Sequence, residues 1–212
     1  MSEEVLFFPL LKRRGAYRTK RTGEYYASYH EYKQEIREDC LGRCVYCDCH
    51  ENELGGSEQM NLDHFRPRKY KEHENLISNP HNLIWACAGC NRLKLDDWPA
   101  LGLEETFVGD TGYLDPFVTK RCDYFAVESH GEIVPLQPPA AYIIIRLELN
   151  RLSRRNKRKE RHDAHKLVEN LTYRIDQLRS KDNLTHEEID LISLMEQSLE
   201  MMKQRLNFEL HE

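Results

Sequence analysis

The stretch NLIWACAGCNRLK (residues 82–94) contains an apolar run, a C-x2-C pair and then a polar segment. A second C-x2-C pair, CVYC, lies upstream at residues 44–47. Each pair, called a knuckle below, can form a turn that presents two thiolates to one ion. Two knuckles together satisfy the tetrahedral coordination of a structural Zn²⁺. The sequence therefore predicts a zinc site made of Cys44, Cys47, Cys87 and Cys90.

Two other interpretations of these cysteines are a thioredoxin-like redox pair and ordinary buried thiols. The presence of two matched pairs favours zinc over both. The 39 residues between Cys47 and Cys87 exceed the length of a usual zinc ribbon, so a further element is expected between the knuckles. Cys40, Cys49 and Cys122 fall outside the pattern and are interpreted as structural thiols.

The insert contains LDHFRPR (residues 62–68), in which an acid and an imidazole are adjacent. If zinc joins the knuckles, Asp63 and His64 are held against the element that begins near the second knuckle. On a helix that starts there, Asn91 and Lys94 share one face, with Arg92 beside them. The sequence thus predicts a concave set of one carboxylate, one imidazole, one amide and several cations.

This set of groups has the chemistry for cutting phosphodiesters. Oxygen ligands from Asp63 and Asn91 suit Mg²⁺, which keeps water and substrate phosphate in its other positions. A histidine that does not bind the metal can accept a proton from water near neutral pH. The candidate contacts to substrate phosphates are Arg66, Arg68, Lys69, Arg92 and Lys94. A base, a hard cation and phosphate contacts are what metal-assisted phosphodiester hydrolysis requires.

Each residue also has an ordinary explanation. An isolated Asp-His pair is usually a polar loop, Asn82 could simply fix a turn, and Asn91 could be an ordinary helix residue. Their combination between two knuckles is what favours the functional interpretation.

Residues 44–99 resemble the HNH endonucleases, the ββα-metal nucleases, in their variant with zinc knuckles. DHFRP (63–67) is similar to that family's Asp-His-x-x-Pro, and residues 82–94 are similar to its Asn-Leu, hydrophobic run, C-x2-C, third motif residue and Lys. The resemblance implies that His64 is the general base and that Asp63 and Asn91 bind a catalytic Mg²⁺ or Mn²⁺. It also implies that Asn82 fixes the hairpin turn and so orients the active-site loop.

The chain departs from the family pattern at two positions. Asn91 stands where histidine is more usual, which gives a His-Asn-Asn set and favours Mg²⁺ over softer metals. Leu95 stands where many relatives have glycine.

Three downstream segments, GYLDP, DYFAVESHGEIVP and LELNRLSRRNKRKER, resemble the C-terminal extension of one HNH subgroup. That subgroup includes the nuclease partners of ATPases in Septu-type and retron-linked bacterial anti-phage systems. The resemblance implies an effector nuclease that cuts DNA, with RNA as the other candidate target, and that has a partner ATPase.

The composition is typical of a soluble protein with a modest core. Of the 212 residues, 40% are hydrophobic and 32% are charged, and no segment resembles a membrane span. The opening MSEEVLFFPLLKRR places acids before a short apolar run, unlike a secretory signal, so we expect a cytoplasmic protein. The net charge of −5 conceals two basic runs, at 12–21 and 151–161, and an acidic stretch at 182–200.

We expect an α+β fold that is mainly helical. Its expected parts are an N-terminal helical segment (1–39), a small zinc-stabilised ββα-metal core (40–100), and a hairpin followed by a C-terminal helical extension (101–212). In the first part, Tyr25, Tyr29, Tyr32 and Ile36 have helical spacing, and a core-facing stripe is favoured over a platform that stacks bases.

The last part carries three local signals. DYFAVESHGEIVPL (123–136) predicts a β-hairpin with Gly131 in its turn. Two apolar stripes then predict an antiparallel helical hairpin, whose second helix begins at a capping box of Thr185 and Glu188. The stripes are Leu167, Leu171, Ile175 and Leu178, then Ile192, Met195, Leu199, Met202 and Leu206. The helical hairpin and the basic run 151–161 are the candidates for a partner surface and a substrate surface.

Two other function classes fit parts of the sequence. A zinc-stabilised module that binds nucleic acid or a partner without catalysis explains the cysteines and the basic runs. It gives no reason for Asp63, His64 and Asn91 to occur at their spacing. A catalytic-zinc hydrolase such as a base deaminase needs H-x-E followed by P-C-x-x-C. The H-x-E at 130–132 lies downstream of both knuckles and no proline precedes Cys87, which excludes that class.

Overall fold

The computed structural model describes residues 6–100, 102 and 104–206. The chain forms two compact units, Met1–Arg158 and Lys159–Glu212. The residues described form helices and three two-stranded sheets, which confirms the α+β class. The expected three-part division at residues 40 and 101 stays a prediction, and both boundaries fall inside the first unit.

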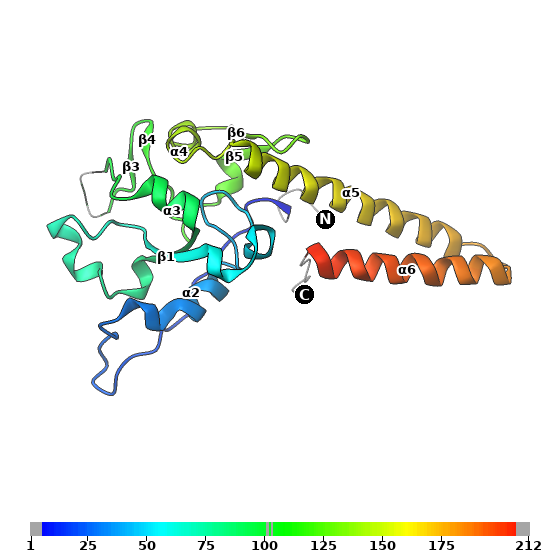
Figure 1. The fold of residues 1–212 in the computed structure, drawn as a ribbon, viewed down its shortest axis with the longest axis horizontal. Coiled ribbons are helices and arrows are strands. Elements are labelled where there is room, and N and C mark those ends of the chain that lie inside the picture. The colour runs from blue at the N-terminus through cyan, green and yellow to red at the C-terminus, as the bar shows by residue number, and fades with distance from the viewer. Residues whose placement is uncertain (1–5, 101, 103, 207–212) are drawn as a thin grey trace. The chain divides into compact units, whose positions relative to one another are not determined.

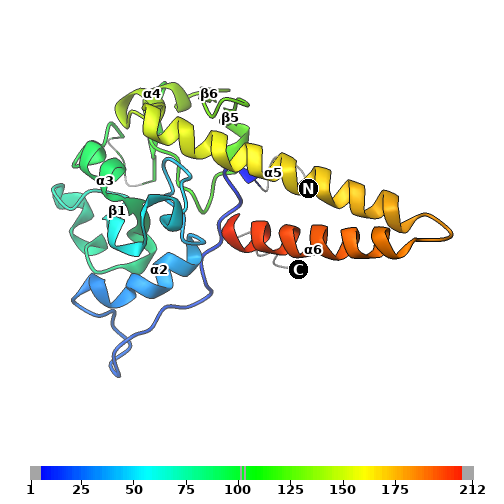
Figure 2. The same ribbon diagram turned by 45° about the vertical axis from the view of Figure 1, so that its right-hand side comes forward.

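The centre of the first unit is an antiparallel strand pair followed by a helix. β1 (Met60–His64) pairs with β2 (Leu83–Cys87), so that Met60 lies opposite Cys87 and His64 lies opposite Leu83. α3 (Ala88–Lys94) begins directly after β2. Figures 1 and 2 show α2 (Lys33–Asp39) and α3 on opposite sides of this hairpin. All five residues of β2 are buried because both of its faces are covered.

The N-terminal segment is less helical than its tyrosine spacing predicts. Helical structure before the first knuckle is limited, among residues 7–39, to a 3₁₀ turn η1 (Tyr29–Tyr32) and to α2. Tyr32 and Ile36 are fully buried, as the core-facing interpretation expects. Tyr25 lies before the helix, because the chain folds back there and the backbone N–H of Tyr26 donates to the Tyr32 hydroxyl at 3.0 Å. The predicted helix through Tyr25 is therefore wrong.

Short elements make up the rest of the first unit. β3 (Phe107–Val108) pairs with β4 (Thr111–Gly112), and α4 (Ala140–Arg146) packs on β6. The other 3₁₀ turns are η2 (Glu51–Leu54), η3 (Ser57–Gln59), η4 (Lys71–Leu76), η5 (Pro80–Asn82) and η6 (Arg121–Asp123). The predicted β-hairpin is confirmed: β5 (Phe125–Val127) pairs with β6 (Ile133–Pro135), and Gly131 in the turn has a φ of 83°.

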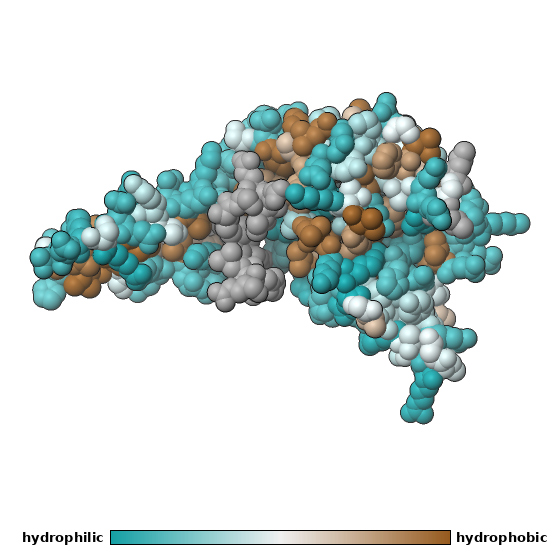
Figure 3. Space-filling model, turned by 180° about the vertical axis from the view of Figure 1, so that it is seen from behind, coloured by the Kyte–Doolittle hydropathy of each residue, from teal (hydrophilic) through white to brown (hydrophobic). Residues whose placement is uncertain are grey.

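The second unit contains the helical hairpin. Its first helix is α5 (Leu152–Arg179), which begins before the boundary at residue 158. The second helix, α6 (His186–Leu206), lies beside α5. The predicted capping box is present, since the Glu188 N–H donates to Thr185 Oγ1 at 3.2 Å and the Thr185 N–H donates to the Glu188 carboxylate at 3.0 Å. The face shown in Figure 3 is hydrophilic over much of both units, with separate apolar patches.

One position in the apolar stripe of α5 was predicted wrongly. Leu167 is 45% exposed, whereas Val168 is buried together with Ile175. At 3.6 residues per turn, Leu167 is rotated by about 80° from Ile175, and Val168 by only about 20°. On α6, Ile192 is buried as expected, and the side chain of Leu206 lies outside the described residues. No helix in the described part of the chain is both long and apolar enough to cross a membrane.

One buried arginine, Arg121, forms hydrogen bonds with two separate loops of the first unit. Arg121 is 3% exposed and donates to the carbonyl oxygen of Val45 at 2.7 Å and to that of Pro9 at 3.0 Å. It therefore joins the N-terminal segment to the first knuckle.

Replacing Arg121 tests this role. Arg121→Ala removes the donor from two carbonyl groups, so the free energy of unfolding should fall by about 2–4 kcal/mol in a denaturant titration. Lys120→Ala is the matched control: Lys120 has a half-exposed side chain and a surface ion pair with Asp123, so its loss should cost less than about 1 kcal/mol. Equal losses in the two variants would contradict the assignment.

Candidate metal centre and active site

The four predicted cysteines lie together in the structure. Cys44, Cys47, Cys87 and Cys90 are all buried, and their sulfur atoms lie within 4.8 Å of one another. Cys47 Sγ and Cys87 Sγ are 3.9 Å apart. A tetrahedral ion with Zn–S bonds of about 2.3 Å separates its sulfur ligands by about 3.8 Å. The cluster could therefore hold a metal such as zinc.

The four sulfurs differ in acidity: the pKa values of Cys47 and Cys87 are lowered by hydrogen bonds from neighbouring thiols, whereas those of Cys44 and Cys90 are raised well above the ordinary value. The Cys90 backbone N–H donates to Cys87 Sγ at 3.4 Å. A hydrogen bond from the Cys44 thiol is the main cause that lowers the pKa of Cys87 to about 7. Cys40 and Cys49 are also buried but, like Cys122, do not belong to the metal-ligand group found among the described residues, as predicted. Burial raises the pKa of the Cys40 thiol to about 12.

Two arginines contact the cluster, Arg151 directly before α5 and Arg154 in its first turn. An Arg154 NH2 group donates to Cys87 Sγ at 3.4 Å, and an Arg151 NH2 group lies 3.8 Å from Cys90 Sγ. Gly89 leaves room for them, because a Cβ at that position would lie 2.9 Å from the Arg151 guanidinium. Four thiolates around one divalent ion carry net negative charge, which two guanidinium groups can offset.

This arrangement assigns part of the basic run 151–161 to the cysteine cluster. Arg158 is fully buried and donates to the carbonyl oxygens of Gly131 at 2.7 Å, Leu149 at 2.9 Å and Cys47 at 3.5 Å. Arg154 and Arg158 are four residues apart and so share one face of α5, and Arg151 lies directly before the helix. Arg158 is buried and the other two are partly buried, so they contact the cysteine cluster and its surroundings instead of forming a substrate surface.

Asp63, at the end of β1, is held by two groups from other elements. The Tyr46 hydroxyl donates to Asp63 Oδ2 at 2.8 Å, and the Lys94 ammonium lies 3.6 Å from the same oxygen. Burial raises the pKa of the Asp63 carboxyl, while Lys94 and Tyr46 act in the opposite direction. Neither contact uses Oδ1, and Asp63 also lines a pocket.

The prediction that Lys94 contacts substrate phosphate is wrong. Lys94 is fully buried, and its ammonium donates to the His64 carbonyl oxygen at 3.1 Å. Its charge is matched by Asp63 inside the protein, although burial lowers the pKa of the Lys94 ammonium. Lys94 therefore fixes the end of β1 against α3.

His64 has a defined orientation. Its Nε2 lies 2.9 Å from the Ile77 carbonyl oxygen. Because a carbonyl can only accept, Nε2 carries the proton and Nδ1 is the basic atom of the neutral ring. Burial lowers the pKa of His64, and the nearby charges of Arg68 and Lys94 lower it further. The Tyr29 ring meets the imidazole edge to face, with centroids 4.7 Å apart.

Asn82 bonds to the backbone of the loop after β1. Its Oδ1 accepts from the Arg66 N–H at 2.9 Å, and its Nδ2 donates to the Arg66 carbonyl oxygen at 3.0 Å. The side chain is 3% exposed and does not line the pocket. Asn82 thus positions the loop that carries the predicted phosphate contacts.

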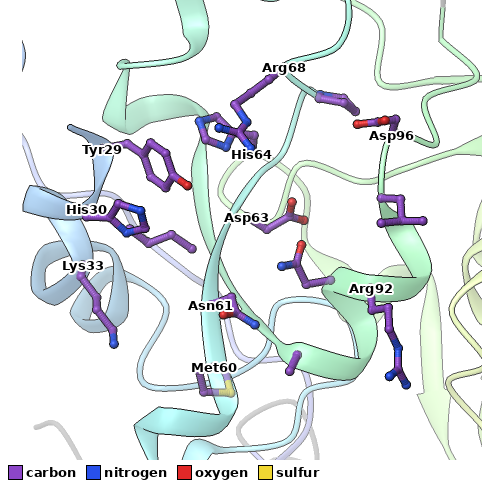
Figure 4. Close-up of a pocket in the computed structure, with 15 residues that line it drawn as sticks. Tyr29, His30, Lys33, Met60, Asn61, Asp63, His64, Arg68, Arg92 and Asp96 are labelled. Atoms are coloured by element: carbon purple, nitrogen blue, oxygen red, sulfur yellow. The ribbon is translucent and has the colours of Figure 1, made fainter. Parts of the chain in front are cut away.

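A pocket of about 620 Å³ joins these groups. Asp63, His64 and Asn91 all line it, together with Arg68 and Arg92. In Figure 4, Asp63 points toward α3 and His64 points toward Tyr29. The structure therefore brings the predicted carboxylate, imidazole and amide to one cavity.

Two other predicted phosphate contacts lie outside this cavity. Neither Arg66 nor Lys69 lines it. The Arg66 guanidinium lies 5.7 Å from the ring centroids of both Phe65 and Trp98, so aromatic packing holds it. Lys69 is exposed on the loop.

Four residues of the site were not predicted as functional. Tyr46 stands between the two cysteines of the first knuckle, and its position in CVYC gave no sign of a bond to Asp63. Tyr29, His30 and Lys33 line the pocket from the N-terminal segment. The spacing of Tyr29 predicts a core-facing stripe and contains no signal for the pocket.

Comparisons of the chain with family models, curated proteins and solved structures found no match.

Replacing Arg154 tests the link between α5 and the metal centre. In Arg154→Gln, zinc should pass to a colorimetric chelator about tenfold faster or more, because a hydrogen-bonded countercharge is lost. Arg155→Gln is the matched control on the same helix, since Arg155 pairs instead with Glu132 at 3.3 Å. Equal release rates from both variants and the wild type would contradict the role.

Proposed function

We propose that the protein is a metal-dependent endonuclease of the HNH type that hydrolyses phosphodiester bonds in DNA. The observation that carries the proposal is the pocket in which Asp63, His64 and Asn91 meet. His64 is oriented there by a backbone carbonyl, so that Nδ1 remains the basic atom. The four-cysteine cluster takes a structural Zn²⁺ in this proposal.

His64 acts as the general base. Its lowered pKa keeps the imidazole neutral at pH 7, and the Ile77 carbonyl holds the tautomer whose Nδ1 can accept a proton from water. The water oxygen bonds to phosphorus while the bond from phosphorus to the 3′ oxygen breaks. The products then carry 5′-phosphate and 3′-hydroxyl ends.

Asp63 and Asn91 are the candidate ligands of the catalytic ion. Both offer oxygen atoms beside the pocket, and Tyr46 and Lys94 fix the carboxylate of Asp63. When bound, Mg²⁺ or Mn²⁺ would offset charge on the phosphate and on the departing oxygen. Arg68 and Arg92 line the same pocket and contact the substrate backbone.

The broader setting rests on sequence resemblance. The segments after residue 110 resemble the extension of HNH nucleases that work with ATPases in anti-phage systems. We therefore propose an effector nuclease of a cytoplasmic defence complex with a partner ATPase. DNA is the proposed target, and RNA is the other outcome of a cleavage assay.

A zinc-stabilised binding module without catalysis is the second candidate. It accounts for the cysteine cluster and its arginines. It gives no role to an imidazole that is held by Ile77 at the wall of a pocket.

Plasmid cleavage with and without Mg²⁺ tests the proposal. The wild type, with any partner ATPase, should cut only with the metal, and His64→Ala should cut at least about 100-fold more slowly, because a general base contributes about 10²–10⁴-fold. His186→Ala, an exposed histidine of α6, should cut like the wild type. Absence of cutting by the wild type, or equal cutting by His64→Ala, would overturn the proposal.

Metal binding provides a readout that needs no cleavage. Asn91→Ala should weaken Mn²⁺ binding measured by calorimetry on zinc-loaded protein, and His64→Ala should leave it nearly unchanged, since His64 is not a ligand. Asp63 is unsuitable for this test, because its removal would leave the buried Lys94 without its carboxylate partner. Equal Mn²⁺ affinity in Asn91→Ala and the wild type would exclude Asn91 as a ligand.

A further inference from the structure

The pocket extends beyond the Asp63–Asn91 pair to a second wall that the HNH resemblance does not include. This wall is made by Tyr29, His30 and Lys33 of the N-terminal segment. Figure 4 shows these three residues on one side of β1, with Arg92 and Asp96 on the other side. A hydrogen bond from Ser78 Oγ to the Ala27 carbonyl oxygen, at 3.2 Å, ties the N-terminal segment to the loop that orients His64.

The cations around this pocket lack acidic partners. Lys33, Arg68 and Arg92 are exposed, and none of them forms an ion pair within the described part of the chain. Some exposed or half-exposed bases elsewhere are paired, as Arg18 is with Glu35 and Arg146 with Asp97, and others such as Lys69 and Lys71 form no ion pair within the described residues. Asp63 is matched by Lys94, so Asp96 is the remaining acid on the pocket wall. The pocket therefore carries excess positive charge, which suits a ligand with several negative charges.

Lys33 stands apart from the proposed reacting groups. It lies four residues after Tyr29, so the two side chains share a face of the η1–α2 segment. Its ammonium lies 5.8 Å from the centroid of the buried Trp85 ring. Lys33 thus places an ammonium, with the imidazole of His30 on the same wall, across β1 from Arg92.

Aromatic stacking on a base does not fit this wall. The Tyr29 ring already contacts His30, with centroids 4.2 Å apart, and His64 at 4.7 Å. The Arg68 guanidinium lies 5.6 Å from its centroid. Tyr29 is therefore occupied as a positioning residue between His64 and Arg68. The groups left for a substrate on this side are the Lys33 ammonium and the His30 imidazole.

We propose that Lys33, assisted by His30, binds a backbone phosphate of the nucleic acid next to the one that is cut. The inference rests on the proposed nuclease function and adds a substrate requirement. A strand must carry at least one further phosphate beside the scissile bond to be cut efficiently. A lysine contacts phosphate as a point charge, so the contact is independent of base sequence.

Two substrates separate this contact from the chemistry. Bis(p-nitrophenyl) phosphate has a single phosphodiester and no neighbouring phosphate, whereas an oligonucleotide has many. Lys33→Gln should lower kcat/KM for the oligonucleotide about tenfold and reduce the salt dependence of binding by about one phosphate contact. Hydrolysis of the small diester should stay within about twofold of the wild type. Lys71→Gln, an exposed lysine outside the pocket, is the matched control and should change neither.

Neutral linkages then locate the contact. A methylphosphonate beside the scissile position should slow cleavage by the wild type about as much as the Lys33→Gln substitution does. In the Lys33→Gln variant, the same methylphosphonate should cause little further loss of rate. Equal cleavage of the oligonucleotide by Lys33→Gln and the wild type would overturn the inference, as would equal losses on both substrates.

The affinity for a labelled oligonucleotide, measured in Ca²⁺ in place of Mg²⁺, tests the contact between Lys33 and phosphate without cleavage. If the wild type cuts neither substrate, the proposed function fails, and the binding measurement still tests whether Lys33 contacts phosphate. Unchanged affinity and salt dependence in Lys33→Gln would then refute the phosphate contact, and a loss of about tenfold in affinity would support it.

Discussion

The meeting of four cysteine sulfurs is the constraint on which the rest of the first unit depends. The two knuckles are separated by a long insert, and their sulfurs nevertheless lie within 4.8 Å of one another. One knuckle sits at the junction of β2 and α3, so the cluster fixes where the helix begins. β1 pairs with β2 in a register that places Met60 beside the cluster and His64 at the far end. The loop beyond β1 lies at the end of the hairpin away from the cluster and is held by other contacts.

Buried polar side chains hold that loop and its surroundings. Asn82 bonds both backbone groups of Arg66, Lys94 bonds the His64 carbonyl, and Arg121 joins the first knuckle to the N-terminal segment. Each of these side chains satisfies backbone groups that would otherwise be buried without partners, which is costly. This explains how a chain with 40% hydrophobic residues can order so much irregular structure. The Ile77 carbonyl oxygen, a backbone group, keeps His64 in one tautomer at the pocket.

Local patterns in the sequence predicted the features that depend on short spacing. The C-x2-C pairs gave the cysteine cluster, Gly131 gave the β-hairpin turn, and Thr185 with Glu188 gave the start of α6. The HNH resemblance brought Asp63, His64 and Asn91 to attention, and they do line one pocket.

The features that were missed depend on partners far away in the chain. A charged residue beside an active-site motif suggests phosphate binding, but Lys94 faces Asp63 across 31 positions and is buried. The basic run 151–161 suggests a substrate surface, yet Arg154 reaches a cysteine 67 positions earlier. Tyr29 and Lys33 reach the pocket only because the N-terminal segment folds against the loop near Ser78. Spacing alone contains no signal for such contacts, because they are set by how the elements pack.

The metal content of the purified protein, with zinc-edge X-ray absorption, tests the central claim most directly. The account predicts about one zinc per chain, surrounded by four sulfur atoms at about 2.3 Å. It also predicts that Cys87→Ser loses the metal and unfolds more easily, whereas His64→Ala retains both the metal and the fold. Much less than one zinc per chain, or a zinc bound through nitrogen and oxygen atoms, would contradict the account.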